Sequence, residues 1–348
     1  MGSSSPIRPT GSIQWLLPKL DLSSRWTILG TISAEERWMA AATECRKLAV
    51  NSDVRFLRIA PSQTSGSVDW VLETNRQIAA HSNVALSCFG ADSVPYDSEL
   101  NAIDHDIIKL ADRIAQDCTP DVVLDVSTMP KRFFFPILTR LCEHTQIQTL
   151  VVANTTPIEY AKELAADAEE WRSLPIYCGE NFEANNDITL IIGVGYHPFR
   201  IQEILERSRG QRLGIKLILP FPSLHPGWIE NWKFVHGIVT EWSTATAPIP
   251  MIRVPVQDVS LAFDALRQHS QDGRAPAVIM APFGPKALSV AMSLLGVARG
   301  LEGLPTEIGY TQPQRYNPDY SKGIATEDRI PRVTGFCVRL NGRNLYSL

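Results

Sequence analysis

The chain has 348 residues and a formal net charge of −4 at pH 7, so it lacks the basic surplus of a general nucleic-acid-binding protein. Its length exceeds one typical domain and suits two. Its six cysteines form no C-x-x-C pair, which is typical of reduced thiols in a cytosolic protein, and no apolar run approaches the roughly 20 residues of a membrane helix.

In the first half, a Ser-, Pro- and Gly-rich stretch over residues 1–24 predicts a flexible leader. Apolar strands then alternate with helical stretches, the first of which opens with the capping box Ser33–Glu36. The expected strands are 26–31, 54–59, 84–89, 122–126 and 149–153, and the expected later helices are 68–81, 100–118 and 133–144.

The second half repeats this alternation after a composition break. The expected strands are 187–192, 215–219, 252–256, 277–280 and 306–310, and the expected helices are 198–208, 261–269 and 286–299. We expect a loop with a short helix over 220–232 and an antiparallel terminal pair formed by 333–340 and 344–347.

Strands that alternate with helices of this length predict a parallel sheet. The fold class is therefore α/β, with two tandem Rossmann-like parallel-sheet domains produced by an internal duplication. We expect a leader over 1–24, domain 1 over 25–160, a linker over 161–186, and domain 2 with the terminal β-pair over 187–348. Right-handed crossovers place every strand-to-helix turn at one edge of its sheet, where open α/β sheets bind ligands.

The duplication is indicated by two motifs that recur at nearly the same offset. A strand, a tight turn and Pro-Lys precede a helix at Lys131 and again at Lys286, about 155 positions apart. A Thr-x-Pro-x-x-Tyr motif follows at Thr155 and again at Thr311, about 156 positions apart. A domain-sized period argues for a duplicated domain rather than a solenoid.

The two lysines are the strongest candidates for ligand binding. Each stands at the first turn of an expected helix, where unpaired N–H groups and the helix dipole attract anions. Ser127, Thr128 and Gly284 precede them and allow hydroxyl contacts or close backbone approach. The pattern predicts a phosphate or carboxylate site in each half. The alternative is that Ser127 or Thr128 only caps a helix and the lysines are solvated.

Other candidates lie at the same sheet edge. Asp125 ends a strand and is a candidate to orient Lys131, bind a ribose hydroxyl or act as a base, or it only forms the turn. Thr31 and Gly195 end the first strand of each half, but neither completes the G-x-G-x-x-G dinucleotide fingerprint. They imply a tight turn or a close approach of the backbone.

Two further pairs of residues recur between the halves. Arg37 and Arg200 stand early in the first helix of each half and point either into a ligand cleft or to the surface. Tyr160 and Tyr316 follow the fifth strands, where a tyrosine either stacks on a base or caps the sheet. The histidines lack metal-ligand spacing, so we expect no metal and no cofactor.

The strand, small-residue turn, lysine and apolar helix resemble the motif of CRISPR-associated Rossmann-fold (CARF) sensor domains, and two such units are similar to the related SAVED sensors. The matching positions are Thr128–Lys131, Gly284–Lys286, and the turns at Thr31 and Gly195. The chain departs from the family with prolines where Gly-Thr is usual. In those families the equivalent turns line a cleft for cyclic oligonucleotides, which implies nucleotide sensing in prokaryotic antiviral defence.

The expected function is therefore a soluble cytoplasmic sensor or regulatory subunit that binds a nucleotide or another phosphorylated small molecule or oligonucleotide. One alternative is a nucleotide- or nucleoside-processing hydrolase, a glycosidase or phosphodiesterase, that uses Asp125 as its catalytic group. A second is a scaffold subunit. We expect no general nucleic-acid binding and no membrane, and the pattern leaves open a protein partner or a homo-oligomer.

Overall fold

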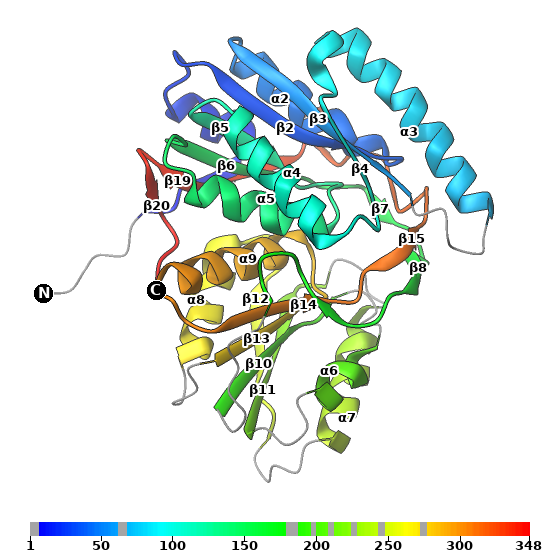
Figure 1. Cartoon of the computed structure of the whole chain (residues 1–348), viewed down its shortest axis with the longest axis vertical. Coiled ribbons are helices and arrows are strands. Elements are labelled where there is room, and N and C mark those ends of the chain that lie inside the picture. Colours follow the sequence, from blue (N-terminus) through cyan, green and yellow to red (C-terminus); the bar gives the residue numbers. More distant parts are fainter. Residues whose placement is uncertain are drawn as a thin grey trace, which may run out of the picture. The chain divides into compact units, whose positions relative to one another are not determined.

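The computed structural model describes residues 7–61, 68–178, 187–195, 200–207, 212–223, 228–242, 248–271 and 277–348 (Figure 1). The chain divides into two compact units. Unit 1 comprises Met1–Asp167 and Pro313–Leu345, and unit 2 comprises Ala168–Gln312 and Tyr346–Leu348. This division differs from the expected domain boundaries, because most of the C-terminal tail joins unit 1.

Unit 1 contains a sheet in which β4, β3, β2, β5 and β6 are parallel and adjacent in that order. Strand β19 continues the sheet antiparallel to β6, and β1 and β20 pair with β19. The bounds are β1 (Thr10–Ser12), β2 (Trp26–Ile32), β3 (Ser52–Ala60), β4 (Tyr96–Glu99), β5 (Asp121–Asp125), β6 (Thr149–Thr155), β19 (Val333–Leu340) and β20 (Arg343–Asn344).

Helices pack against this sheet through apolar side chains. Buried residues of α2 and α3 join those of β2, β3 and β6 in one core, and α4 lies against α5 (Figure 1). The helices are α1 (Ile13–Leu16), α2 (Ala40–Leu48), α3 (Val68–Phe89), α4 (Asp104–Asp117) and α5 (Lys131–Glu143), with 3₁₀ turns η1 (Leu17–Lys19), η2 (Glu36–Met39) and η3 (Ala91–Ser93).

Short strand pairs tie the tail to the segment that follows β6. Strand β7 (Glu159–Tyr160) pairs with β16 (Ser321–Lys322), and β8 (Ala165–Ala168) pairs with β15 (Pro313–Tyr316). Strands β17 (Thr326–Glu327) and β18 (Ile330–Pro331) form a hairpin.

Unit 2 contains a sheet in which β12, β11, β10, β13 and β14 are parallel and adjacent in that order, followed by antiparallel β9. The strands are β9 (Arg172–Ser173), β10 (Asp187–Gly193), β11 (Arg212–Phe221), β12 (Met251–Pro255), β13 (Ala277–Pro282) and β14 (Thr306–Tyr310). The helices are α6 (Ile201–Arg207), α7 (Ile229–Trp242), α8 (Val259–Gln271) and α9 (Lys286–Leu301).

The two sheets have the same strand order. When the parallel strands of each unit are numbered along the chain, both sheets run 3-2-1-4-5 and add an antiparallel strand beside strand 5. This Rossmann-like order in both units confirms the predicted fold class and is what an internal duplication predicts. Each antiparallel strand lies in the segment that comes after a strand 5 in the chain. Strand β9 lies in the segment after β6, and β19 lies in the segment after β14.

Several expected elements were wrong. Residues 84–89 continue α3 instead of forming a strand, because Ile78, Ser82 and Ala85 follow helical spacing and are buried together. The third strand is the polar Tyr96–Glu99, whose charged residues hide it from a hydrophobicity pattern. The expected loop and short helix over 220–232 are also wrong in extent, because residues 229–242 form the full helix α7.

The leader also differs from its prediction. Ile13, Leu16 and Leu17 are almost completely buried against unit 1, and residues 10–19 form β1, α1 and η1. Burial of these three side chains anchors a segment whose composition had suggested a flexible coil. The predicted terminal pair is present as β19 and β20, although β20 ends at Asn344. No helix in the described ranges is long and apolar enough to cross a membrane.

Candidate ligand-binding site

Each sheet has a point where its strand order reverses, between strand 1 and strand 4. In unit 1 these strands are β2 and β5, and in unit 2 they are β10 and β13. Connections from the two strands leave toward opposite faces there, which opens a crevice at the carboxyl ends. The predicted site residues lie at the carboxyl ends of these two strands or just beyond them: Thr31, Ser127, Thr128 and Lys131 in unit 1, and Gly195, Gly284 and Lys286 in unit 2.

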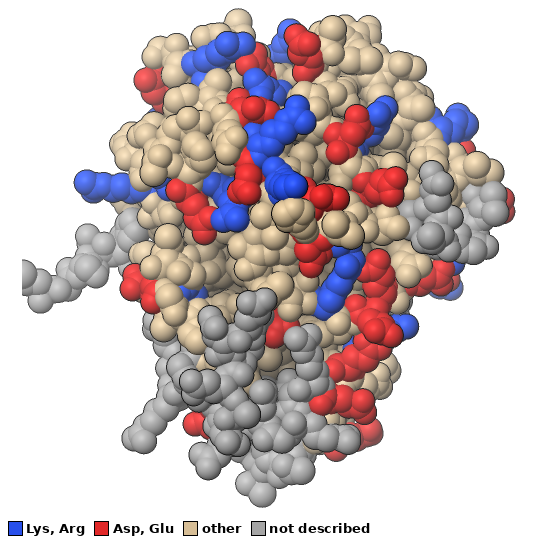
Figure 2. Space-filling view, viewed as in Figure 1, with Lys and Arg blue, Asp and Glu red and all other residues tan. Residues whose placement is uncertain are grey.

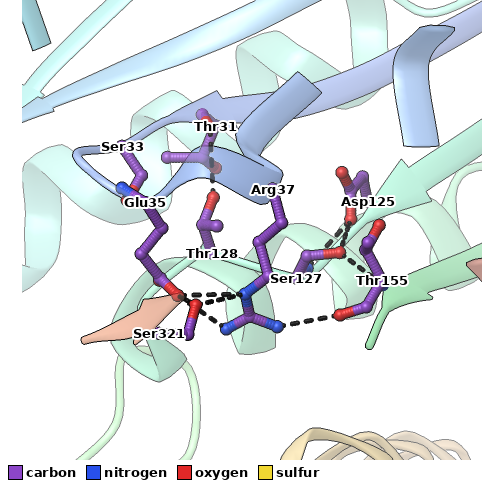
Figure 3. Close-up of polar contacts among 9 residues, drawn as sticks. All are labelled: Thr31, Ser33, Glu35, Arg37, Asp125, Ser127, Thr128, Thr155 and Ser321. Atoms are coloured by element: carbon purple, nitrogen blue, oxygen red, sulfur yellow. Dashed lines mark hydrogen bonds and ion pairs between the residues drawn. The ribbon is translucent and has the colours of Figure 1, made fainter. Parts of the chain in front are cut away.

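The two turns of unit 1 are joined by a polar network (Figure 3). Thr128 Oγ1 donates to the Thr31 carbonyl oxygen at 3.1 Å, which links the β5 turn to the end of β2. Asp125 Oδ1 accepts from the Ser127 backbone N–H at 2.9 Å and from its hydroxyl. The Ser127 Oγ in turn accepts from the Thr155 N–H at 2.7 Å. The network fixes the carboxyl ends of β2, β5 and β6 together.

These bonds assign Asp125 a role in holding its turn. Its side chain is buried, with the residue only 3% exposed, and one of its oxygens already accepts two hydrogen bonds from Ser127. A general base needs access to a substrate proton. The geometry therefore favours the turn-forming interpretation of Asp125 over the catalytic one.

Both lysines begin equivalent helices. Lys131 is the first residue of α5 and Lys286 is the first residue of α9, and each helix follows strand 4 of its sheet. The residues before them, Pro130 and Pro285, take the N-cap positions, and neither cap makes a side-chain hydrogen bond. Ser127 and Thr128 are therefore not the caps of α5. Both lysines are partly exposed.

Two buried hydroxyls of unit 1 lie beside this turn. Thr31 is 3% exposed at the end of β2, and Thr155 is fully buried at the end of β6. Their Oγ1 atoms have no hydrogen-bond partner within the described ranges. A buried hydroxyl without a partner costs stability and therefore needs an explanation, of which a bound ligand is one. The sequence analysis selected Thr31 but did not identify the hydroxyl of Thr155.

Arg37 lies in a buried network next to the first-strand turn. It is 2% exposed, its Nη2 lies 2.9 Å from Glu35 Oε2, and its other nitrogens donate to Ser321 Oγ and the Thr155 carbonyl oxygen (Figure 3). Burial is the largest single influence and lowers the pKa of Arg37. The Glu35 carboxylate, together with Tyr160 and Tyr320, raises the pKa by more, so the net pKa is raised. Arg37 thus remains charged and ties the β2 turn to the tail. Sequence analysis had no signal for Glu35 or Ser321.

Arg200 has a different environment, although it stands at a related position in unit 2. Its side chain is 43% exposed and forms an ion pair of 2.8 Å with Glu203 on its own helix turn. The structure therefore does not give the two arginines equivalent contacts.

Tyr160 and Tyr316 also depart from the expected symmetry, because both belong to unit 1. Their rings pack edge-on against Tyr320 with centroid distances of 6.1 and 6.0 Å. Arg37 lies 5.9 Å from the Tyr160 ring centroid. Burial raises the pKa of Tyr160. These contacts favour the capping role for the tyrosines over stacking on a base.

In unit 2 the two turns meet through glycine backbones. A Cβ on Gly195 would lie 2.9 Å from the Gly284 Cα and 3.0 Å from the Phe283 carbonyl oxygen. Only glycine fits this approach without a shift of the backbone. The Asn231 side-chain amide donates to the Gly195 carbonyl oxygen at 3.1 Å. The predicted close approach is present, and it joins two segments of the protein itself.

Cysteines and candidate metal ligands are spread through the described ranges. Within them, no group of three or more His, Cys, Asp or Glu side chains could hold a metal ion. All six cysteines are free thiols, and Cys45, Cys118, Cys142 and Cys337 are buried.

Comparison with protein-family models gives no match, and neither does comparison with curated proteins. Among solved structures, the chain is similar to a protein assigned as a universal stress protein from Pseudomonas aeruginosa UCBPP-PA14, with 10% identity, a TM-score of 0.26, and coverage of 83% of this chain and 93% of that one. It is also similar to a universal stress protein from Archaeoglobus fulgidus DSM 4304, with 8% identity, a TM-score of 0.26, and coverage of 82% and 96%.

Proposed function

We propose that the chain is a sensor or regulatory subunit that binds a phosphate-bearing ligand, a nucleotide or oligonucleotide, at the strand-order reversal of its sheets. One observation carries the proposal: Lys131 and Lys286 occupy the same topological position in two sheets of the same strand order. Each follows strand 4 at the edge where open α/β sheets bind ligands.

Electrostatics supports an anionic ligand. A helix N-terminus carries a partial positive charge, so a lysine there is unfavourable for the helix alone. A phosphate reverses this balance because it accepts hydrogen bonds from the first-turn N–H groups and pairs with the ammonium group. In unit 1 the buried Thr31 hydroxyl adds a further donor at the adjacent strand end.

Binding without turnover is favoured because Asp125, the candidate catalytic acid or base, already accepts two hydrogen bonds from Ser127. The resemblance to CARF and SAVED sensors extends the proposal to cyclic oligonucleotides and to a cytoplasmic role in prokaryotic antiviral defence. Acidic and basic side chains are interspersed over the face of unit 1 drawn in Figure 2, which is consistent with a local pocket rather than a broad nucleic-acid surface.

The test is a thermal-shift and calorimetric titration of the full chain with nucleoside mono- and triphosphates and with cyclic oligonucleotides. We expect a ligand that raises the melting temperature, with an affinity that falls as salt increases, because charge-assisted contacts are screened. Lys131→Ala and Lys286→Ala should each weaken binding by about 1.5–3 kcal/mol, the scale of a hydrogen bond to a charged group.

The matched controls are Lys47→Ala in unit 1 and Lys233→Ala in unit 2, whose exposed ammonium groups pair with a glutamate three residues earlier on the same helix. These variants should bind like the wild type. Equal losses in test and control variants would contradict a site at the helix starts. Loss of assembly with no response to any nucleotide would favour the scaffold function instead.

A further inference from the structure

Unit 1 has a groove beside its strand-order reversal that the sequence analysis did not identify. It has a volume of about 500 Å³, within the range of small-molecule sites. The last residues of β3 and β4 form its floor, and the middle of α3 forms its wall. Its lining residues are Arg58, Ala60, Asn75, Ile78, Ala79, Asp97, Ser98 and Glu99.

The groove lies next to the β2 turn, one strand away from the candidate phosphate site. On the floor, Arg58 lies directly beside Ile32, the last residue of β2. On the wall, His81 Nδ1 donates to the carbonyl oxygen of Ser33 in the β2 turn at 2.7 Å, one helical turn beyond Ile78. Strands are about 4.8 Å apart, so β3 and the β5 turn are separated by roughly 10 Å. An extended small molecule is long enough to cover that distance.

The charge of the groove differs from that of the lysine-bearing turn. The Arg58 guanidinium is paired with the Asp97 carboxylate. The Glu99 side chain is exposed in the groove, and among the described residues no hydrogen bond or ion pair engages its carboxylate. The groove therefore carries one uncompensated negative charge. It disfavours a phosphate and favours a neutral group with hydroxyl donors.

The remaining lining suits a flat apolar ring. Ile78, Ala60 and Ala79 present small aliphatic surfaces, and Asn75 adds an amide that both donates and accepts. We propose that this groove is the subsite for the nucleoside part of the ligand, with Glu99 accepting hydrogen bonds from the ribose hydroxyls and the base lying over the aliphatic residues. The proposal rests on the proposed function, because it assigns the phosphate of the same ligand to the Lys131 turn.

The experiment compares AMP, its 2′-deoxy analogue, ribose 5-phosphate and inorganic pyrophosphate by calorimetric titration of the full chain. Wild type should bind AMP most tightly. Glu99→Gln should weaken the affinity for AMP about tenfold or more, which is the scale of a lost hydrogen bond to a charged group. It should change the affinity for the deoxy analogue much less. The coupling between the side chain and the hydroxyl is the diagnostic readout, because a merely structural effect would weaken both ligands equally.

A second variant tests the groove without removing a charge. Ala79→Phe fills it, whereas Ala80→Phe places the same ring on the next exposed position of α3, outside the lining. Ala79→Phe should reduce AMP affinity more than ribose 5-phosphate affinity, because the base is displaced first, and Ala80→Phe should change neither.

The outcomes separate this subsite from the proposed function. Suppose that all four compounds bind, that binding depends on Lys131, and that neither Glu99→Gln nor Ala79→Phe has an effect. This result would overturn the subsite but would leave the phosphate site unchallenged. AMP binding that needs the groove but not Lys131 would support the subsite and overturn the phosphate site. Wild type that binds none of the compounds would overturn both.

Discussion

The first-strand turns of the two sheets occupy the same topological position, yet different interactions stabilise them. In unit 1, Thr128 bonds to Thr31, and Arg37 and Ser127 bond to the end of β6. In unit 2, Gly195 and Gly284 pack backbone against backbone. One turn therefore offers side-chain hydroxyls and a buried charge, whereas Gly195 and Gly284, which the structure describes in the other, offer main-chain groups.

This difference shows how one topology supports two unequal sites. Buried polar networks have strict geometry, because each missing partner costs the desolvation of the group that remains. Glycine contacts depend on shape alone. If both sites bind a phosphate, unit 1 can add specificity from the described hydroxyls, whereas the described residues of unit 2 contribute a lysine and main-chain donors. The following variants test this comparison, from the largest expected effect to the smallest.

The largest effect should come from the arginines. Arg37→Ala should lower the free energy of unfolding by about 3–5 kcal/mol, because it leaves the Glu35 carboxylate buried without its partner. Arg200→Ala should change it by less than about 1 kcal/mol, because its ion pair is exposed. Urea denaturation of both variants measures the difference. Equal effects would show that the two turns are stabilised alike.

Ser127→Ala should be the next most harmful substitution in unit 1. It removes an acceptor from the buried Thr155 N–H and a donor from Asp125, so we expect a loss of about 1–3 kcal/mol. Denaturation gives the value, and hydrogen exchange should show faster opening at the end of β6. Unchanged protection of the Thr155 amide would contradict the network.

Gly195→Ala tests the shape-dependent turn of unit 2. The new methyl group meets the Gly284 backbone, which cannot rotate away as a side chain would, and overpacking of this kind costs about 1–3 kcal/mol. Gly237→Ala is the control, because its Cβ meets nothing within 4 Å and α7 should gain about 0.5–1 kcal/mol. A stable Gly195→Ala protein would show that the turns do not need close approach.

Alkaline pH should weaken unit 1 through its buried thiols. Burial raises the pKa of Cys142 from 9.0 to about 12. Below pH 9 the thiol is protonated in both the folded and the unfolded state, so its contribution to the free energy of unfolding is fully present. As pH rises from 9 toward 12 the unfolded chain loses the proton first, so stability falls. Denaturation at pH 8 and pH 10 should show this loss, and Cys142→Ala should make it smaller.

The smallest effect on stability is expected for Thr31→Val. The substitution keeps the shape and removes a buried hydroxyl that has no partner within the described ranges, so stability should stay within about 1 kcal/mol of wild type or rise. Ligand binding at unit 1 should weaken. Full affinity in this variant would remove the hydroxyl from the proposed site.

Part of this fold was predictable because local pattern and tertiary structure agree. The apolar strands and the Pro-Lys helix starts are local signals, and they placed Lys131 and Lys286 on equivalent elements. Residues 84–89 show the limit, because a short apolar run fits a strand or a helix until its packing partners are known. The polar β4 was missed because its pattern lacks hydrophobic alternation.

The sequence by itself determined the α/β class, the repeated unit and the residues at the carboxyl ends of strands, since these depend on periodicity and turn chemistry along a short stretch of chain. Only the tertiary structure decided what those residues contact. Arg37 meets Ser321 and Thr155, and Tyr160 and Tyr316 meet around Tyr320, because the tail returns to unit 1. Such pairs are far apart in sequence, so no local pattern encodes their contact; the closure of the chain around a common core brings them together.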